Sequence, residues 1–286
     1  MKGEGKMRRR IVSGIFVAVV ICLIILSGIE IFDLACSLLA AIAIYEVYEA
    51  FRIKGFKPIY IAGYIACACI FLGSIDHWNR FEWGWLRRII TFVDIRLLLY
   101  LSLLVMFCFI IFRTGKYTVA DISVTILGAF YVCFLFWYLM MTRTLRAGQY
   151  AVWFIFLGSV VTDTFAFFIG RFFGKTKLIP EISPKKTVEG AVGGALACVI
   201  VFVLYGVLIF DKYAYPNPFW QYAIMGFACG IVAQIGDLAA SSIKRYCGIK
   251  DFGKIIPGHG GILDRMDSAI LISPLVYVMI TVIDKV

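Results

Sequence analysis

Long apolar stretches separated by short charged segments are the feature that most limits how this chain can fold. A helix needs about 20 mostly apolar residues to cross a hydrocarbon core roughly 30 Å thick. Stretches of this kind can be read at residues 11–28, 31–51, 59–75, 95–112, 119–141, 150–173, 190–210, 220–243 and 268–283. With 62% hydrophobic and 16% charged residues, the chain lies outside the usual composition of soluble domains. We therefore predict an all-α, polytopic integral membrane protein with about nine transmembrane helices.

The distribution of basic residues predicts how these helices are oriented. The net charge is +10, and most of the 28 Lys and Arg residues fall on one side if the N-terminus is cytoplasmic. This asymmetry is the one that the positive-inside rule describes. We predict a multi-pass protein of the cell (inner) membrane with its N-terminus and active site on the cytoplasmic side. Because the basic residues are dispersed over loops between spans, we expect no nucleic acid partner.

Polar groups inside the apolar stretches concentrate toward the C-terminus. Up to residue 149 the stretches look like packing or lipid-facing helices, whereas the later ones carry polar groups and adjoin two basic loops. We therefore predict that residues 1–149 supply packing and oligomer contacts. Residues 150–286 are predicted to form the catalytic region, with two cytoplasmic basic loops.

The first polar group of this C-terminal region is an aspartate in "SVVTDTFAFFIGRFFGK". Asp163 lies between two threonines inside an apolar stretch. A charged group at that depth costs a few kcal/mol, so it usually faces a protein interior, a cavity or a partner. We favour a functional Asp163 over a simple helix-helix hydrogen bond. Gly170 and Gly174, four residues apart, are predicted to permit close helix packing.

A second polar segment, "SPKKTVEGAVGG", leads into a glycine-rich helix start. Its candidate substrate-binding residues are Ser183, Lys185, Lys186, Thr187 and Glu189. Backbone N–H groups at a helix N-terminus, together with lysines, can bind phosphate. An ordinary positive-inside loop with a capped helix explains the segment equally well, and both interpretations stay open.

A third group spans the last two apolar stretches. In "QIGDLAASSIKR", one helix face is expected to carry Gln234, Asp237, Ser241 and Lys244. Asp264 and Asp267 lie three residues apart at the start of the last stretch. If the two helices form a hairpin, Asp237 and Asp264 could converge near the cytoplasmic interface. Carboxylates without Cys or His neighbours suit Mg²⁺, and we favour a metal and phosphate site over helix capping.

His259 lies in a glycine-rich loop, with Gly258 before it and Gly260 and Gly261 after it. Glycine lets the backbone approach a ligand closely. The histidine could be a base, a phosphate donor or a structural loop residue.

Residues Ser241 to Asp267, "SSIKRYCGIKDFGKIIPGHGGILDRMD", resemble the signature of the CDP-diacylglycerol synthases, or phosphatidate cytidylyltransferases. Every position of that long pattern is filled. Upstream, Asp163, the glycine pair and "SPKKTVEG" are similar to the family's order of elements. The resemblance covers about residues 162–267 at the level of motifs, whereas the first half agrees only in being hydrophobic.

The resemblance implies that CTP and phosphatidic acid react at the bilayer to give CDP-diacylglycerol and pyrophosphate. It also implies Mg²⁺, with a second, monovalent cation as an option, and a nine-helix fold that forms a homodimer. Two alternatives remain: a cytidylyltransferase acting on an isoprenoid lipid phosphate, and a cation-coupled membrane transporter that uses Asp163 and Asp237.

The resemblance, together with the charges, gives each candidate residue a role. A phosphomonoester has a second pKa of about 6, so the lipid phosphate can attack CTP at pH 7 without a base. Metal binding is assigned to Asp237 and Asp264, with Asp163 and Asp267 in support. Phosphate binding is assigned to Lys185, Lys186, Lys244, Arg245, Lys250 and Arg265. His259 becomes a positioning or pyrophosphate-side donor, and the further substrate contacts are Ser183, Thr187, Glu189, Ser241, Asp251, Gly260 and Gly261.

Overall fold

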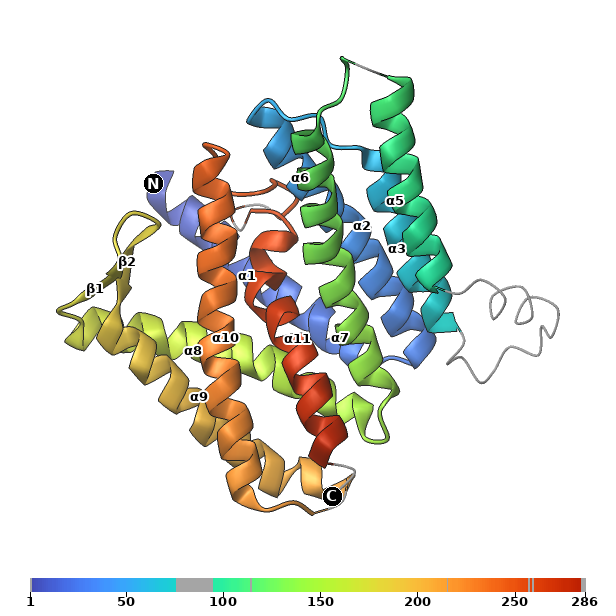
Figure 1. The fold of residues 1–286 in the computed structure, drawn as a ribbon. Helices are drawn as coiled ribbons and strands as arrows, with labels where there is room; N and C mark the ends of the chain where they lie inside the picture. Colours follow the sequence, from blue (N-terminus) through green and yellow to red (C-terminus); the bar gives the residue numbers. More distant parts are fainter. Residues whose placement is uncertain are drawn as a thin grey trace. The chain divides into compact units, whose positions relative to one another are not determined.

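The described residues are almost entirely helical (Figure 1). The computed structural model describes residues 2–75, 95–113, 115–214, 216–256, 258 and 260–283, without the side chains of 2–12, 75, 95–99, 101 and 102. The helices are α1 Lys2–Leu26, α2 Ile29–Ile53, α3 Tyr60–Ile75, α5 Ile95–Phe112, α6 Val119–Ala129, the π-helical η1 Phe130–Phe134, α7 Leu135–Thr144, α8 Gly148–Phe173, α9 Val188–Leu208, the short η2 Phe210–Lys212, α10 Phe219–Tyr246 and α11 Leu263–Ile283.

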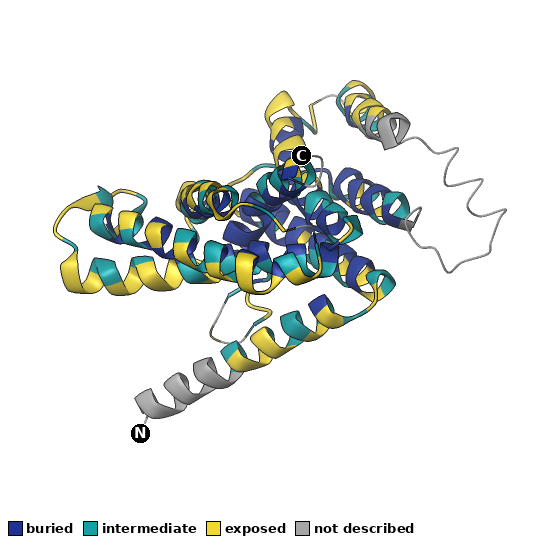
Figure 2. Ribbon diagram, turned by 90° about the horizontal axis from the view of Figure 1, so that it is seen from below, coloured by how far each residue is buried: buried dark blue, intermediate teal, exposed yellow. Residues whose placement is uncertain are grey.

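Each apolar stretch predicted from the sequence falls largely within these helices. Within the described residues, six helical segments are long and apolar enough to cross a membrane: Ile29–Ile53, Val119–Thr144, Gly148–Phe173, Val188–Lys212, Phe219–Tyr246 and Leu263–Ile283. Figure 2 shows exposed residues (yellow) along many helices. Large apolar side chains such as Phe168, Ile200 and Phe227 are among them, as expected where lipid is the solvent. The chain is therefore a multi-pass membrane protein.

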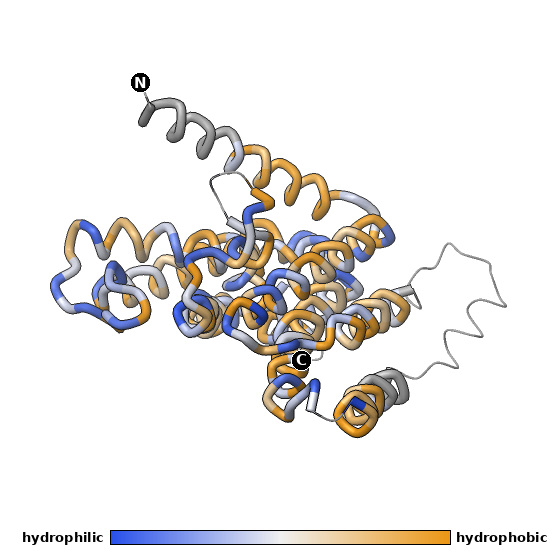
Figure 3. The backbone as a smooth tube through the Cα atoms, turned by 90° about the horizontal axis from the view of Figure 1, so that it is seen from above, coloured by the Kyte–Doolittle hydropathy of each residue, from blue (hydrophilic) through white to orange (hydrophobic). Residues whose placement is uncertain are grey.

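One short hairpin departs from the predicted all-α fold. β1 (Lys177–Ile179) pairs antiparallel with β2 (Ser183–Thr187), with Lys177 opposite Thr187 and Ile179 opposite Ser183. Figure 3 shows that blue, hydrophilic parts alternate with short orange parts in this hairpin. The segment predicted as a basic loop is thus a strand that leads directly into α9.

The described chain divides into two compact units, and each has its own core. The first comprises Met1–Met140 with Tyr246–Asp264, and the second Met141–Arg245 with Arg265–Val286. In the first, α2, α3 and α6 pack around the fully buried Tyr48. Its hydroxyl donates to the Thr125 carbonyl at 2.8 Å. A Cβ at Gly63 or Gly128 would collide with the Tyr48 ring, so these glycines allow the close packing.

Candidate active site

Small residues bring the helices of the second unit close together around its polar groups. A Cβ at Gly194 of α9 would meet the Thr162 carbonyl of α8. A Cβ at Gly236 of α10 would meet the Asp267 carbonyl of α11. Close backbone approach of this kind is typical of helices packed in a membrane. The neighbours of Gly194 in the sequence therefore lie near those of Thr162. In the same way, the neighbours of Gly236 lie near those of Asp267.

Three carboxylates and two basic side chains of the second unit interact through their charges. Asp163 of α8 interacts electrostatically with Asp237 of α10, with Asp267 and Arg265 of α11, and with Lys186 of β2. We call these five residues the polar cluster. Asp163 is accessible at the surface of its unit, whereas Asp267 is buried. The sequence predicted a role for each of the five, and those roles stay predictions.

An ion pair connects the hairpin with α10. Lys186 Nζ lies 2.6 Å from Asp237 Oδ2, and the Ser241 hydroxyl is 3.4 Å from Asp237 Oδ1. Successive residues of a strand point to opposite faces, and Lys185, next to Lys186, is exposed. The two lysines therefore have different surroundings, although nothing in the sequence distinguishes them.

The other candidates around the hairpin have structural contacts. The Thr187 hydroxyl oxygen caps α9 by accepting the Gly190 N–H at 3.2 Å, and the Glu189 carboxylate accepts the Thr176 N–H. A Cβ at Gly170 or at Gly174 would collide with the Thr187 side chain, which confirms that these glycines serve close packing. Contact of Ser183, Thr187 and Glu189 with substrate stays a prediction.

In the first unit, a carboxylate organises the glycine-rich loop between α10 and α11. Asp264 Oδ2 accepts the Phe252 N–H at 2.8 Å and the Gly261 N–H at 2.9 Å. Gly260 has a φ of 86°, in the left-handed region that favours glycine. His259 lies outside the described residues, so its predicted role stays a prediction. Asp237 and Asp264 belong to different units, and their convergence stays a prediction as well.

Sequence reasoning missed one acidic side chain that contacts this loop. Glu46 of α2 is only 2% exposed. It accepts the Ile262 N–H at 3.0 Å and the Leu263 N–H at 2.9 Å. The sequence signal that identified Asp163 applies to Glu46 as well, because an ionisable residue inside an apolar stretch is a functional candidate by default.

The remaining candidates are distributed between buried and exposed positions. Lys244 is 8% exposed. The exposed candidates are Arg245, Lys250, Asp251 and Arg265. In the part of the chain that the structure describes, no three Cys, His, Asp or Glu side chains lie close enough together to hold a metal ion by themselves.

Carboxylates and basic side chains beside a basic hairpin in an apolar helical protein are groups that suit the binding of phosphate compounds at a membrane. Comparison with known proteins shows which family of membrane enzymes the chain is similar to. Phosphatidate cytidylyltransferase of Bacillus subtilis (strain 168) is 32% identical over 280 residues, covering 96% of this chain and 97% of the relative. That of Staphylococcus saprophyticus is 32% identical over 274 residues, covering 96% and 99%.

A plant relative is similar to this chain at a comparable level of identity. Phosphatidate cytidylyltransferase 4, chloroplastic, of Arabidopsis thaliana is 29% identical over 307 residues, covering 96% of this chain and 74% of the relative. The model of the cytidylyltransferase family matches residues 8–283. The chain belongs to the cytidylyltransferase family and is a CTP-dependent nucleotidyltransferase.

Proposed function

We propose that this protein is a phosphatidate cytidylyltransferase, which converts CTP and phosphatidic acid into CDP-diacylglycerol and pyrophosphate for phospholipid biosynthesis. The observation that carries the proposal is the alignment of 96% of the chain with phosphatidate cytidylyltransferases. The isoprenoid-phosphate and transporter alternatives have no comparable support.

The decisive experiment is an assay of the purified protein with CTP, Mg²⁺ and a panel of lipid phosphates. Pyrophosphate release with phosphatidic acid, together with a CDP-lipid product, is the expected result. If the enzyme prefers an isoprenoid phosphate, that lipid replaces phosphatidic acid as the proposed acceptor. Absence of pyrophosphate release with every lipid would refute the nucleotidyltransferase assignment.

The reaction needs positioning and charge neutralisation more than proton transfer. A phosphate oxygen of the lipid attacks the α-phosphorus of CTP, and the bond from that phosphorus to the oxygen bridging to the β-phosphorus breaks. The lipid phosphate is largely dianionic at pH 7, because its second pKa is about 6. Two polyanions must therefore be brought into line. Lys186 and Arg265 of the polar cluster are proposed to bind their phosphates, together with Lys185, Lys244, Arg245 and Lys250.

Mg²⁺ is the proposed cofactor, and the donors of the polar cluster fit its chemistry. Mg²⁺ prefers oxygen ligands, keeps several waters and is usually bound by one or two carboxylates plus substrate phosphates. Asp237 and Asp264 are the proposed ligands, with Asp163 and Asp267 in support. When bound, it would neutralise charge on the triphosphate. The monovalent cation stays an optional addition.

The ion pair between Lys186 and Asp237 predicts that the two neighbouring lysines differ in importance. Lys186→Ala is expected to lower kcat/KM for CTP about ten- to hundredfold, the range of a lost hydrogen bond between charged groups. Lys185→Ala should cost less than about fivefold, because exposed charges contribute little. Steady-state kinetics of both variants measure the difference. Equal losses, or none, would contradict the assignment of Lys186 to phosphate.

The distribution of Lys and Arg supports a finer topology. We propose nine membrane crossings, a cytoplasmic N-terminus, and a cytoplasmic location for both the hairpin and the loop after α10. With Cys in place of the exposed Ile255, an impermeant maleimide should label the protein only after cells are opened. Burial raises the pKa of the Cys247 thiol, so this cysteine should react slowly. If the variant is labelled more strongly than the parent protein in intact cells, the loop lies outside the cell.

The resemblance also supports a homodimer, to which residues 1–149 would contribute contacts while residues 150–286 carry most of the catalytic groups. Native mass spectrometry of the detergent-solubilised protein should give twice the chain mass. A monomeric mass with full activity would remove the dimer from the proposal.

A further inference from the structure

Glu46 is an acidic residue buried in an apolar helix of the first unit. It lies in α2 and is only 2% exposed. A buried carboxylate is costly unless it is hydrogen-bonded or paired. Both of its oxygens have backbone partners: Oε1 accepts the Ile262 N–H at 3.0 Å, and Oε2 accepts the Leu263 N–H at 2.9 Å. These donors are at the N-terminus of α11, where a negative charge is also favoured by the helix dipole.

Two glycines of the loop make room for this carboxylate. A Cβ at Gly253 or at Gly261 would collide with the Glu46 side chain. Both glycines lie within the loop that precedes α11, and neither has a positive φ. Their small size, and not an unusual backbone conformation, is therefore what this site requires.

Asp264 also binds the backbone of this loop. The Phe252 and Gly261 N–H groups donate to Asp264 Oδ2, and the Ile256 N–H donates to the Gly260 carbonyl at 2.9 Å. Three successive N–H groups, from residues 261–263, thus bind the carboxylates of Asp264 and Glu46. This start of α11 differs from a free phosphate-binding helix N-terminus, because side chains already occupy its donors.

We propose that Glu46 is a positioning residue of the nucleotidyl-transfer site, an inference that rests on the proposed function. It holds the two residues directly before Asp264, and so fixes where the Asp264 carboxylate and the glycine-rich loop lie. It acts through Asp264 without touching substrate. The fold thereby makes a helix of the N-terminal half part of the catalytic machinery.

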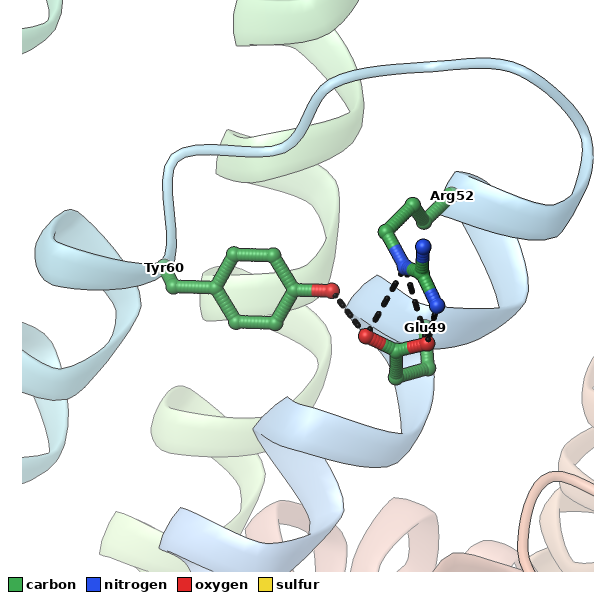
Figure 4. Close-up of polar contacts among 3 residues, drawn as sticks. All are labelled: Glu49, Arg52 and Tyr60. Carbon is green, nitrogen blue, oxygen red and sulfur yellow. Dashed lines mark hydrogen bonds and ion pairs between the residues drawn. The ribbon is translucent and has the colours of Figure 1, made fainter.

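The test compares Glu46→Gln with Glu49→Gln. The first substitution would keep the size of the side chain but place an NH₂ group against one of the two N–H donors. Glu49, one turn further along α2, is the matched control because its carboxylate binds Arg52 and Tyr60 instead of the loop (Figure 4). The first readout is trypsin cleavage after the exposed Lys254, relative to the exposed Lys177 of the hairpin, in detergent without nucleotide or metal.

Glu46→Gln is expected to speed cleavage at Lys254 about tenfold, as for the loss of one hydrogen bond to a charged group. Cleavage at Lys177 should not change, and Glu49→Gln should cleave like the wild type. The second readout is turnover: kcat of Glu46→Gln should fall about tenfold, with a raised Mg²⁺ concentration for half-maximal activity. Glu46→Asp keeps the charge but is too short to reach both donors, so it should show the same changes. It replaces Glu46→Gln in the test if the Gln variant does not fold.

Unchanged cleavage at Lys254 in the Gln and Asp variants would overturn the proposal. So would faster cleavage with wild-type kcat and Mg²⁺ dependence, since Glu46 would then be only structural. The cleavage readout does not depend on the reaction. A wild-type protein without cytidylyltransferase activity would therefore refute the proposed function separately from the contact of Glu46 with the loop.

Discussion

Asp237→Asn is expected to reduce kcat/KM by about two to three orders of magnitude, similar to the loss of one preorganised electrostatic contact at a reacting centre. Asn is nearly the same size as Asp and can still accept the Ser241 hydroxyl, so the packing of α10 should survive. What is lost is the charge that pairs with Lys186 at 2.6 Å and that is proposed to retain Mg²⁺. Initial rates over a wide range of Mg²⁺ concentrations give the measurement.

A matched control separates this local effect from a change in the charge of the second unit. Glu181→Gln removes the same charge from the exposed turn of the hairpin, and it should retain wild-type turnover. High Mg²⁺ or Mn²⁺ should restore part of the activity of Asp237→Asn. Near-wild-type turnover with an unchanged Mg²⁺ dependence would remove Asp237 from the metal site.

The sequence predicted the helices well because their signal is local. Each apolar stretch is long enough to be read without knowing its neighbours, and lipid leaves the backbone few alternatives to a helix. The hairpin was missed for the opposite reason. Ser183–Thr187 contains a proline and two lysines, so it lacks the alternation of apolar and polar residues that indicates a strand. Its pairing with Lys177–Ile179 depends on a partner outside the segment.

The candidate site could be predicted where its residues share one helix or one motif. Asp237 and Ser241 are four residues apart, and the structure places their side chains together. The sequence gives adjacent Lys185 and Lys186 the same predicted role, yet the side chains of adjacent residues in a strand point to opposite faces. The contacts of Glu46 with Ile262 and Leu263 could not be predicted, because they join residues more than two hundred positions apart. Only the tertiary fold supplies that connection.

Asp264→Asn is expected to lower kcat by about a hundredfold, as for the loss of a group that stabilises charge at the reacting centre. The glycine-rich loop before α11 should keep its wild-type conformation. In the wild type one oxygen, Oδ2, accepts both the Phe252 and the Gly261 N–H groups. The carbonyl oxygen of Asn can accept the same two bonds, so the variant removes charge but keeps the hydrogen bonds. Trypsin cleavage at Lys254 should therefore match the wild type.

Asp264→Ala provides the comparison, because it removes charge and hydrogen bonds together. Two buried N–H groups would lose their acceptor, which costs about 1–3 kcal/mol each, so the loop should open and cleavage at Lys254 should rise. If Asp264 only organised the loop, Asn would serve as well as Asp, and Asp264→Asn would turn over like the wild type while Asp264→Ala would not. That outcome would remove Asp264 from the proposed metal ligands and leave the polar cluster of the second unit to bind the cation.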